Sequence, residues 1–126
     1  FVLLHDPAGQ EGWSGNFRCV TFVRSAVEPE MATDALISDV GWSWLMEALE
    51  KNNCSFTAES GTVTRVISTS FGMLKGREED SEIEIRASWT PLSSVMDHVQ
   101  AWIELLSLTA QLEPIPDGVS QLIARR

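Results

Sequence analysis

The segment of residues 82–89 (EIEIRASW) limits the possible fold more than any other part of the chain. Its apolar positions, Ile83, Ile85, Ala87 and Trp89, alternate strictly with charged or small polar residues. Because successive residues of a strand point to opposite faces of a sheet, this alternation predicts an antiparallel strand with one dry face and one wet face. A sheet of this kind needs helices on its dry face only.

Other segments supply the remaining strands of such a sheet. A short apolar run at residues 1–5 and a β-like segment at residues 17–26 flank a Gly-rich polar loop, which predicts a hairpin. Both faces of the second strand carry apolar residues, so we expect it to be an interior strand. Residues 55–71 are rich in Thr, Val, Ile and Ser, which predicts one long bent strand or two short ones, with Gly61 at a bulge or turn.

Two segments have helical periodicity. In the first, Trp42, Leu45, Met46 and Leu49 follow the i, i+3, i+4, i+7 spacing. Ser38 or Asp39 is the expected N-cap of this helix, and Asn52-Asn53 is its expected end. Residues 27–38 read as a connection. The second helix covers residues 95 to about 112, begins with a capping-box-like pair of Ser94 and Asp97, and has a wider apolar surface than one sheet face needs.

The element order is therefore β-β-α-β-β-α. It predicts a single α+β domain over residues 1–126, in which an antiparallel sheet carries its helices on one face and residues 113–126 form an irregular tail. The sequence opens with Phe-Val-Leu-Leu and no methionine. We therefore expect an N-terminal segment to be missing.

Charge and hydropathy exclude several functions. The chain has 18 acidic and 9 basic residues in 126, a net charge of −9, which argues against direct binding of nucleic acid or an anionic membrane surface. No apolar run reaches the roughly 20 residues of a membrane span, and no basic segment precedes an apolar run typical of a secretory leader. Any targeting signal would lie in the missing N-terminal segment. We expect a cytoplasmic protein. The two isolated cysteines, Cys19 and Cys54, fit a reducing compartment, and a disulfide bond between them is the alternative.

The sequence contains no recognisable catalytic set. It has no His or Cys spacing typical of a metal site, no nucleophile elbow and no phosphate-binding loop, so we predict no metal, no cofactor and no catalytic residue. His98 reads as a structural histidine at the edge of the apolar helix face. A small-molecule pocket between sheet and helices is the alternative, with His5, Asp6 and Arg65 at its rim.

The arginines allow two further expectations. Arg65 could face Glu82 or Glu84 across a hairpin and form a modest cross-strand pair. Arginines could also bind an anion if four of them converge on one sheet face. These four residues are Arg18, Arg24, Arg65 and Arg86.

Tryptophan is unusually frequent, with five residues and no tyrosine. Trp42 and Trp44 are two positions apart on one helix and cannot share a face, so Trp44 must be covered by another part of the fold or offered to a partner. Trp13 lies in the Gly-rich loop. We predict a non-enzymatic protein–protein interaction module that contacts another protein, or a second copy of itself, through Trp44 and Trp13 or along the second helix.

Four strings carry a family resemblance: LLHDPAGQEGW, GWSWLMEALE, SGTVTRVISTSFG and EIEIRASWTP. Together they resemble the actinobacterial domain-of-unknown-function family numbered 3000, over nearly the whole chain from Phe1 to about Val119. The resemblance implies a cytoplasmic bacterial protein with a further helix and strand before Phe1. It implies no activity, substrate or catalytic residue.

Overall fold

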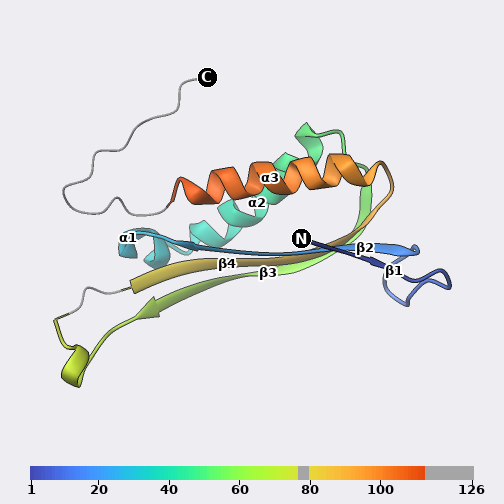
Figure 1. Ribbon diagram of the computed structural model, residues 1–126. Coiled ribbons are helices and arrows are strands. Elements are labelled where there is room, and N and C mark those ends of the chain that lie inside the picture. Colours follow the sequence, from blue (N-terminus) through green and yellow to red (C-terminus); the bar gives the residue numbers. More distant parts are fainter. Residues whose placement is uncertain (77–79, 113–126) are drawn as a thin grey trace.

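The computed structural model describes residues 1–76 and 80–112; the predicted tail, residues 113–126, lies outside them (Figure 1). The described elements follow one another in chain order: β1 (Val2–His5), β2 (Phe17–Ala26), α1 (Pro29–Thr33), α2 (Leu36–Lys51), β3 (Phe56–Ser68), the 3-10 turn η1 (Gly72–Leu74), β4 (Asp80–Pro91) and α3 (Val95–Ala110).

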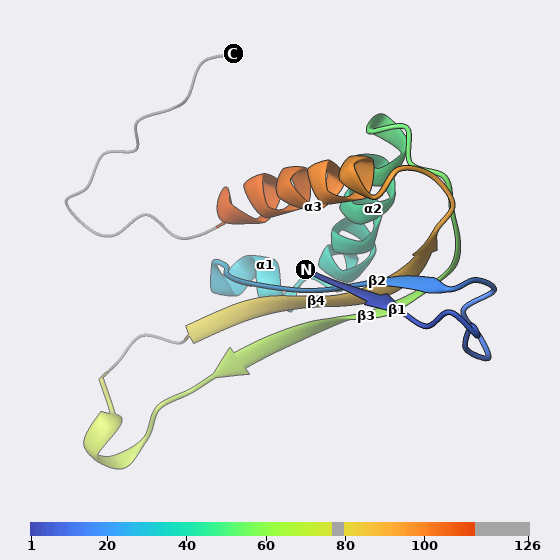
Figure 2. The ribbon, with the colours of Figure 1, turned by 45° about the vertical axis from the view of Figure 1, so that its right-hand side comes forward.

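The four described strands form one antiparallel sheet in the order β1-β2-β4-β3. Two hairpins, β1-β2 and β3-β4, meet where β2 pairs with β4, and β2 is an interior strand as predicted. Helices α2 and α3 lie on the same face of the sheet (Figures 1 and 2). The α+β class and the one-sided arrangement of helices are therefore confirmed.

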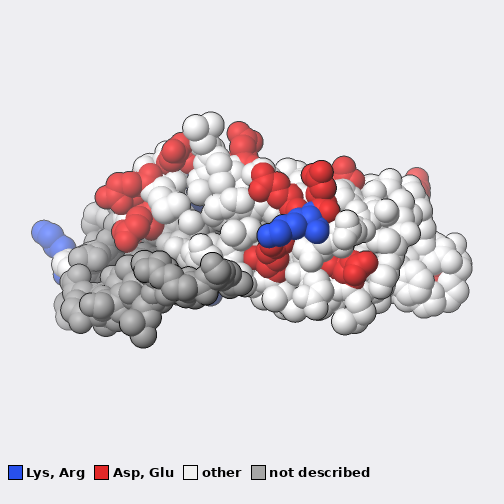
Figure 3. Space-filling view, turned by 90° about the horizontal axis from the view of Figure 1, so that it is seen from above, with Lys and Arg blue, Asp and Glu red and all other residues white. Residues whose placement is uncertain are grey.

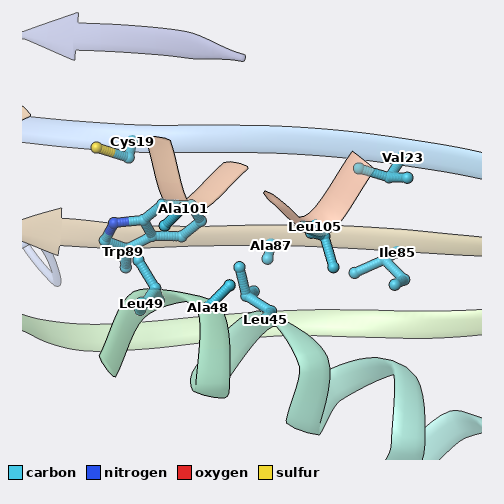
Figure 4. Packing of buried hydrophobic residues seen from close by; sticks show 10 residues of the cluster. All are labelled: Cys19, Val23, Leu45, Ala48, Leu49, Ile85, Ala87, Trp89, Ala101 and Leu105. Atoms are coloured by element: carbon cyan, nitrogen blue, oxygen red, sulfur yellow. The ribbon is translucent and has the colours of Figure 1, made fainter. Parts of the chain in front are cut away.

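The core lies between this sheet and the two long helices. β2, β4, α2 and α3 each contribute side chains to a single buried cluster (Figure 4). Its members are Cys19, Val23, Leu45, Ala48, Leu49, Ile85, Ala87, Trp89, Ala101 and Leu105. The alternation in β4 thus acts as expected: its odd-numbered residues from Ile83 to Trp89 are buried under the helices.

β3 is one long strand with an irregular register. The register shifts between Thr57 and Ser60, and Ala58 has a φ of 54°, so the bulge lies at residues 58–59 and not at Gly61. Gly61 serves close packing instead. A Cβ there would lie 2.3 Å from the Arg86 carbonyl oxygen and 2.6 Å from Trp42 Cζ3. The indole of Trp42 can therefore lie over the strand only because position 61 has no side chain.

The helix boundaries correct two expectations. The predicted connection at residues 27–38 contains the short helix α1, and α2 begins at Leu36, where Asp34 Oδ1 accepts a hydrogen bond from the Leu36 N–H at 2.9 Å. Ser94 is the N-cap of α3 but its side chain makes no capping hydrogen bond, so the predicted capping box with Asp97 does not form. Pro29 fixes the first turn of α1, a start that the search for apolar periodicity overlooked.

α3 is only partly covered. His98, Ala101, Leu105 and Thr109 are buried against the sheet and α2. On the opposite side, Met96 and Ile103 are exposed. The wide apolar surface that the sequence predicted is real, and no other described element covers its outer half.

Candidate functional site

The sheet face opposite the helices carries most of the basic side chains of the strands. Arg18 and Arg24 on β2 and Arg86 on β4 occupy positions that alternate with the core residues, so all three share this open face. Arg65 does not, because it pairs with Ile83 and donates a hydrogen bond to the Ala32 carbonyl oxygen at 3.3 Å. The predicted pairing of Arg65 with Glu82 or Glu84 is therefore wrong, since a buried isoleucine occupies the facing position.

Arg18 is the unusual member of this group, being only 6% exposed although it lies on the open face. Its Nη1 donates to Thr90 Oγ1 at 3.0 Å, and its Nη2 donates to Ser88 Oγ at 2.9 Å and Ser60 Oγ at 3.3 Å. We call these four residues the Arg18 cluster. No carboxylate among residues 1–76 and 80–112 forms an ion pair with Arg18. Burial lowers the pKa of the guanidinium, with Cys19 and Glu59 opposing the shift.

The loop between β1 and β2 closes over one side of the cluster. Thr90 Oγ1, which accepts from Arg18, also hydrogen-bonds the backbone carbonyl of Trp13. A Cβ at Gly15 would lie 2.8 Å from the Thr90 methyl group, so the loop approaches the strand closely at a residue without a side chain. The Gly-rich loop is thus anchored to the sheet through Arg18 and Thr90.

A shallow hollow of about 590 Å³ lies beside the Arg18 cluster on the open face. Ser60 and Ser88 of the cluster line it, and Val20 and Phe22 supply apolar walls. Arg86 lies at the same hollow, with its guanidinium 5.0 Å from the centre of the Phe22 ring. The hollow therefore combines apolar surface, two hydroxyls and cationic charge.

The predicted pocket rim is not brought together. His5 is exposed and stacks on Phe17 with ring centres 4.3 Å apart. Asp6 turns into its own loop, accepting hydrogen bonds from Gln10 and from the Ala8 N–H, and these bonds lower its pKa. Arg65 lies at the other end of the sheet beside α1, whereas His5 and Asp6 lie beside the β1-β2 loop.

The two predicted contact tryptophans are both half-buried. Trp44 packs against the main core cluster, so the protein itself covers part of the Trp44 indole. Trp42 packs against the same cluster. Trp13 enters the Arg18 cluster through its backbone carbonyl. Neither is a freely exposed aromatic group.

The nucleophilic and proton-transferring side chains of the core have structural roles. His98 is fully buried and accepts a hydrogen bond from Trp89 Nε1, as expected for a structural histidine. Cys19 and Cys54 are free thiols, and burial raises the pKa of each to about 11. A neutral histidine and protonated thiols do not form a reactive pair.

A second feature lies at the sheet edge beside α3. β1 pairs only with residues 17–20 of β2, so residues 21–26 have no described strand on that side. Above this unpaired stretch, the Trp102 ring of α3 contacts Phe1, with ring centres 5.8 Å apart. Trp102 Nε1 and Thr21 Oγ1 are buried and, within the described chain, have no hydrogen-bond partner.

The remaining surface narrows the choice of ligand. No group of three or more His, Cys, Asp or Glu residues in the described segments could hold a metal ion. None of the described helices is both long and apolar enough to cross a membrane. Acidic side chains are spread over the helical layer, with few basic ones among them (Figure 3). The helical surface is therefore unsuited to a phosphate backbone.

The architecture defines an α+β protein whose antiparallel sheet is covered by helices on one face and open on the other. A family model described as a protein of unknown function (DUF3000) matches residues 1–120. The chain belongs to this family, as the four sequence strings suggested. No curated protein and no solved structure matches it.

Sequence reasoning named Arg18 as one of four possible anion ligands but missed its partners. Ser88 and Thr90 lie on β4, which pairs with β2, and Ser60 lies on β3, on the far side of β4. The signal was present in the alternation of β4, whose wet face ends in Ser88 and Thr90, two small polar residues. The position of Ser60 depends on the bulge at residues 58–59, which no sequence pattern placed there.

Proposed function

We propose that this protein is a non-enzymatic protein-interaction module. Its docking surface is the outer face of α3. The occupant we propose is an amphipathic helix of another protein, which lays its apolar face along α3. The single observation that carries this proposal is the exposure of Met96 and Ile103, two large apolar side chains that no described element covers.

The spacing on α3 supports this choice. Met96 and Ile103 are seven residues apart, about two helical turns, so they lie on one side of the helix. Their side chains are 63% and 45% exposed. An apolar strip of this kind suits the apolar face of a second helix.

The surroundings of this face indicate the charge of the partner. Acidic side chains are spread over the helical layer, with few basic ones among them (Figure 3). Because opposite charges attract across an interface, we propose a partner helix whose apolar face is flanked by Lys and Arg.

Trp44 and Trp13 keep a smaller part in this proposal. Trp44 packs on the core and Trp13 lies over the Arg18 cluster, so each can contribute only the exposed part of its ring to a partner. The acidic helical surface supports a protein partner over nucleic acid. We also propose that the protein is located in the cytoplasm, because a reducing compartment suits its two free thiols.

Site-specific photo-crosslinking tests the proposal. A photoreactive residue at Ile103 should give a saturable crosslink to one protein, and the same residue at Thr64, exposed on the open face of the sheet, should not. Ile103→Glu should weaken binding of this protein at least tenfold. Equal crosslinking at both positions, or unchanged binding by Ile103→Glu, would contradict the proposal.

A binding pocket for a small molecule is the second candidate, with or without chemistry. One specific observation favours it, the hollow beside the Arg18 cluster. This hollow lies on the open face of the sheet, not between sheet and helices, so its ligand would not contact His5, Asp6 or Arg65.

A further inference from the structure

The Arg18 cluster contains a cation that forms no ion pair with any carboxylate of residues 1–76 and 80–112, although Glu59 acts on it electrostatically. A buried guanidinium is normally paired with a carboxylate, because burying an unpaired charge costs several kcal/mol. Arg18 is 6% exposed, yet its three side-chain acceptors are the neutral hydroxyls of Ser60, Ser88 and Thr90. These hydroxyls hold the guanidinium in place but do not neutralise it.

The same hydroxyls can donate hydrogen bonds into the hollow beside this charge. Ser60 and Ser88 use their oxygen atoms to accept from Arg18, so their hydroxyl protons remain available for a further acceptor. The two oxygens lie 3.5 Å apart, and one hydroxyl can donate to the other. At least one proton is then left over, and both residues line the hollow.

A second cation lies at the same hollow. Arg86 contacts the Phe22 ring and forms an ion pair with Glu84 at 3.7 Å. The Arg86 side chain is 63% exposed, so this ion pair is weak and solvent-screened. Its guanidinium can therefore turn toward an incoming anion at little cost.

The walls of the hollow limit the size and polarity of the ligand. Val20 and Phe22 offer apolar surface between the two cations. Inorganic phosphate would leave this apolar surface uncovered. A carboxylate attached to a flat apolar body would cover it and place its charge at the hydroxyls.

We propose that the hollow on the open face binds a small organic carboxylate. The carboxylate accepts hydrogen bonds from the Ser60 and Ser88 hydroxyls in the field of Arg18 and pairs with Arg86, while its apolar body lies on Val20 and Phe22. This site lies on the open face of the sheet, opposite the docking face on α3 (Figure 1). The two proposals can therefore fail separately.

The test uses naphthalene-2-carboxylate as the probe, with naphthalene-2-methanol and inorganic phosphate as comparisons. Titration followed by amide chemical shifts should show the carboxylate binding at submillimolar concentration, with the shifts concentrated at Val20, Ser60 and Ser88. The neutral alcohol and phosphate should bind at least tenfold more weakly. Equal binding of the alcohol, equal binding of phosphate, or shifts located elsewhere would overturn the proposal.

Variants separate ligand binding from folding. Arg86→Met changes an exposed residue and should weaken carboxylate binding about fivefold without unfolding the chain. Ser88→Ala should weaken it by a similar factor. Arg24→Met is the matched control, because Arg24 lies on the same face but does not line the hollow and instead pairs with Glu82 at 3.7 Å. An equal effect of Arg24→Met and Arg86→Met would show that only general charge attracts the probe.

Discussion

Trp89 Nε1 donates a hydrogen bond to Nδ1 of His98 at 2.9 Å, inside the core where β4 meets α3. The other ring nitrogen, Nε2, lies 3.2 Å from Ser93 Oγ. Because Nδ1 accepts, the imidazole is neutral with its proton on Nε2. This hydrogen bond joins β4 of the sheet to α3, and it gives each of the two buried polar groups a partner.

Stability should fall when the pH drops below the ordinary histidine range. Burial lowers the pKa of His98 in the folded chain below 6.5, although Asp97 opposes the shift. The unfolded chain then binds a proton first as the pH falls. The contribution of His98 is complete above about pH 6.5 and is lost below it, by about 1.4 kcal/mol for each unit of depression.

Urea unfolding at pH 7.5 and pH 5.5 measures this effect. His98→Leu should remove the slope that His98 adds between these two pH values. It should also cost about 1–3 kcal/mol at pH 7.5, because Trp89 Nε1 loses its acceptor. Identical slopes in wild type and His98→Leu would contradict the assigned role.

The two packed glycines should respond in opposite ways to alanine. At Gly61 a methyl group would meet the Arg86 carbonyl oxygen at 2.3 Å, and backbone cannot move aside cheaply, so Gly61→Ala should cost about 2–4 kcal/mol. At Gly41 the nearest atoms are side-chain methyls at 3.4–3.6 Å, and alanine favours a helix by about 1 kcal/mol. Denaturant midpoints of the two variants should differ clearly, and equal midpoints would contradict this packing.

The buried thiol of Cys19 should resist alkylation. Its pKa is raised to about 11 by burial, so only about one thiol in a thousand is ionised at pH 8. In the Cys54→Ser variant, iodoacetamide should react with Cys19 at least about 100-fold more slowly in buffer than in 6 M urea, by the same argument. Comparable rates in both solvents would mean that the core opens readily.

The link between the two long helices should contribute little. Lys51 Nζ donates to Glu104 Oε1 at 2.8 Å, and this bond lowers the pKa of Glu104. The Lys51 side chain is 77% exposed, so Glu104→Gln should cost less than about 1 kcal/mol, with a smaller effect in 0.5 M salt. Thermal unfolding at two salt concentrations checks this, and a larger loss would mean that Asn52, which also bonds Glu104, matters more.

Much of the fold could be predicted because its strongest patterns are local. The alternation in β4 and the helical spacing around Leu45 each identify a buried face without reference to the rest of the chain. The start of α2 was missed although its signal is local, because Asp34 accepts a hydrogen bond from the Leu36 N–H only two residues along the chain. The position of the bulge in β3 could not be predicted, because it depends on the pairing of β3 with β4. Local spacing carries no information on that pairing.

The candidate sites were less accessible to sequence reasoning. Arg18, Ser60 and Ser88 come from three strands, and only the register brings them together. Sequence spacing instead grouped His5 with Asp6, which are adjacent in the chain but turn to different neighbours, Phe17 and Gln10. The prediction for Trp44 rested on helical geometry alone, which could not show that the core would cover part of its ring.

Binding of the purified partner to two single variants tests the proposed docking face most directly. Ile103→Glu places a charge in the exposed apolar strip of α3, whereas Thr64→Glu places one on the opposite face of the sheet. We expect Ile103→Glu to weaken binding at least tenfold and Thr64→Glu to leave it within twofold of the wild type. An equal loss in the two variants would contradict a docking face on α3.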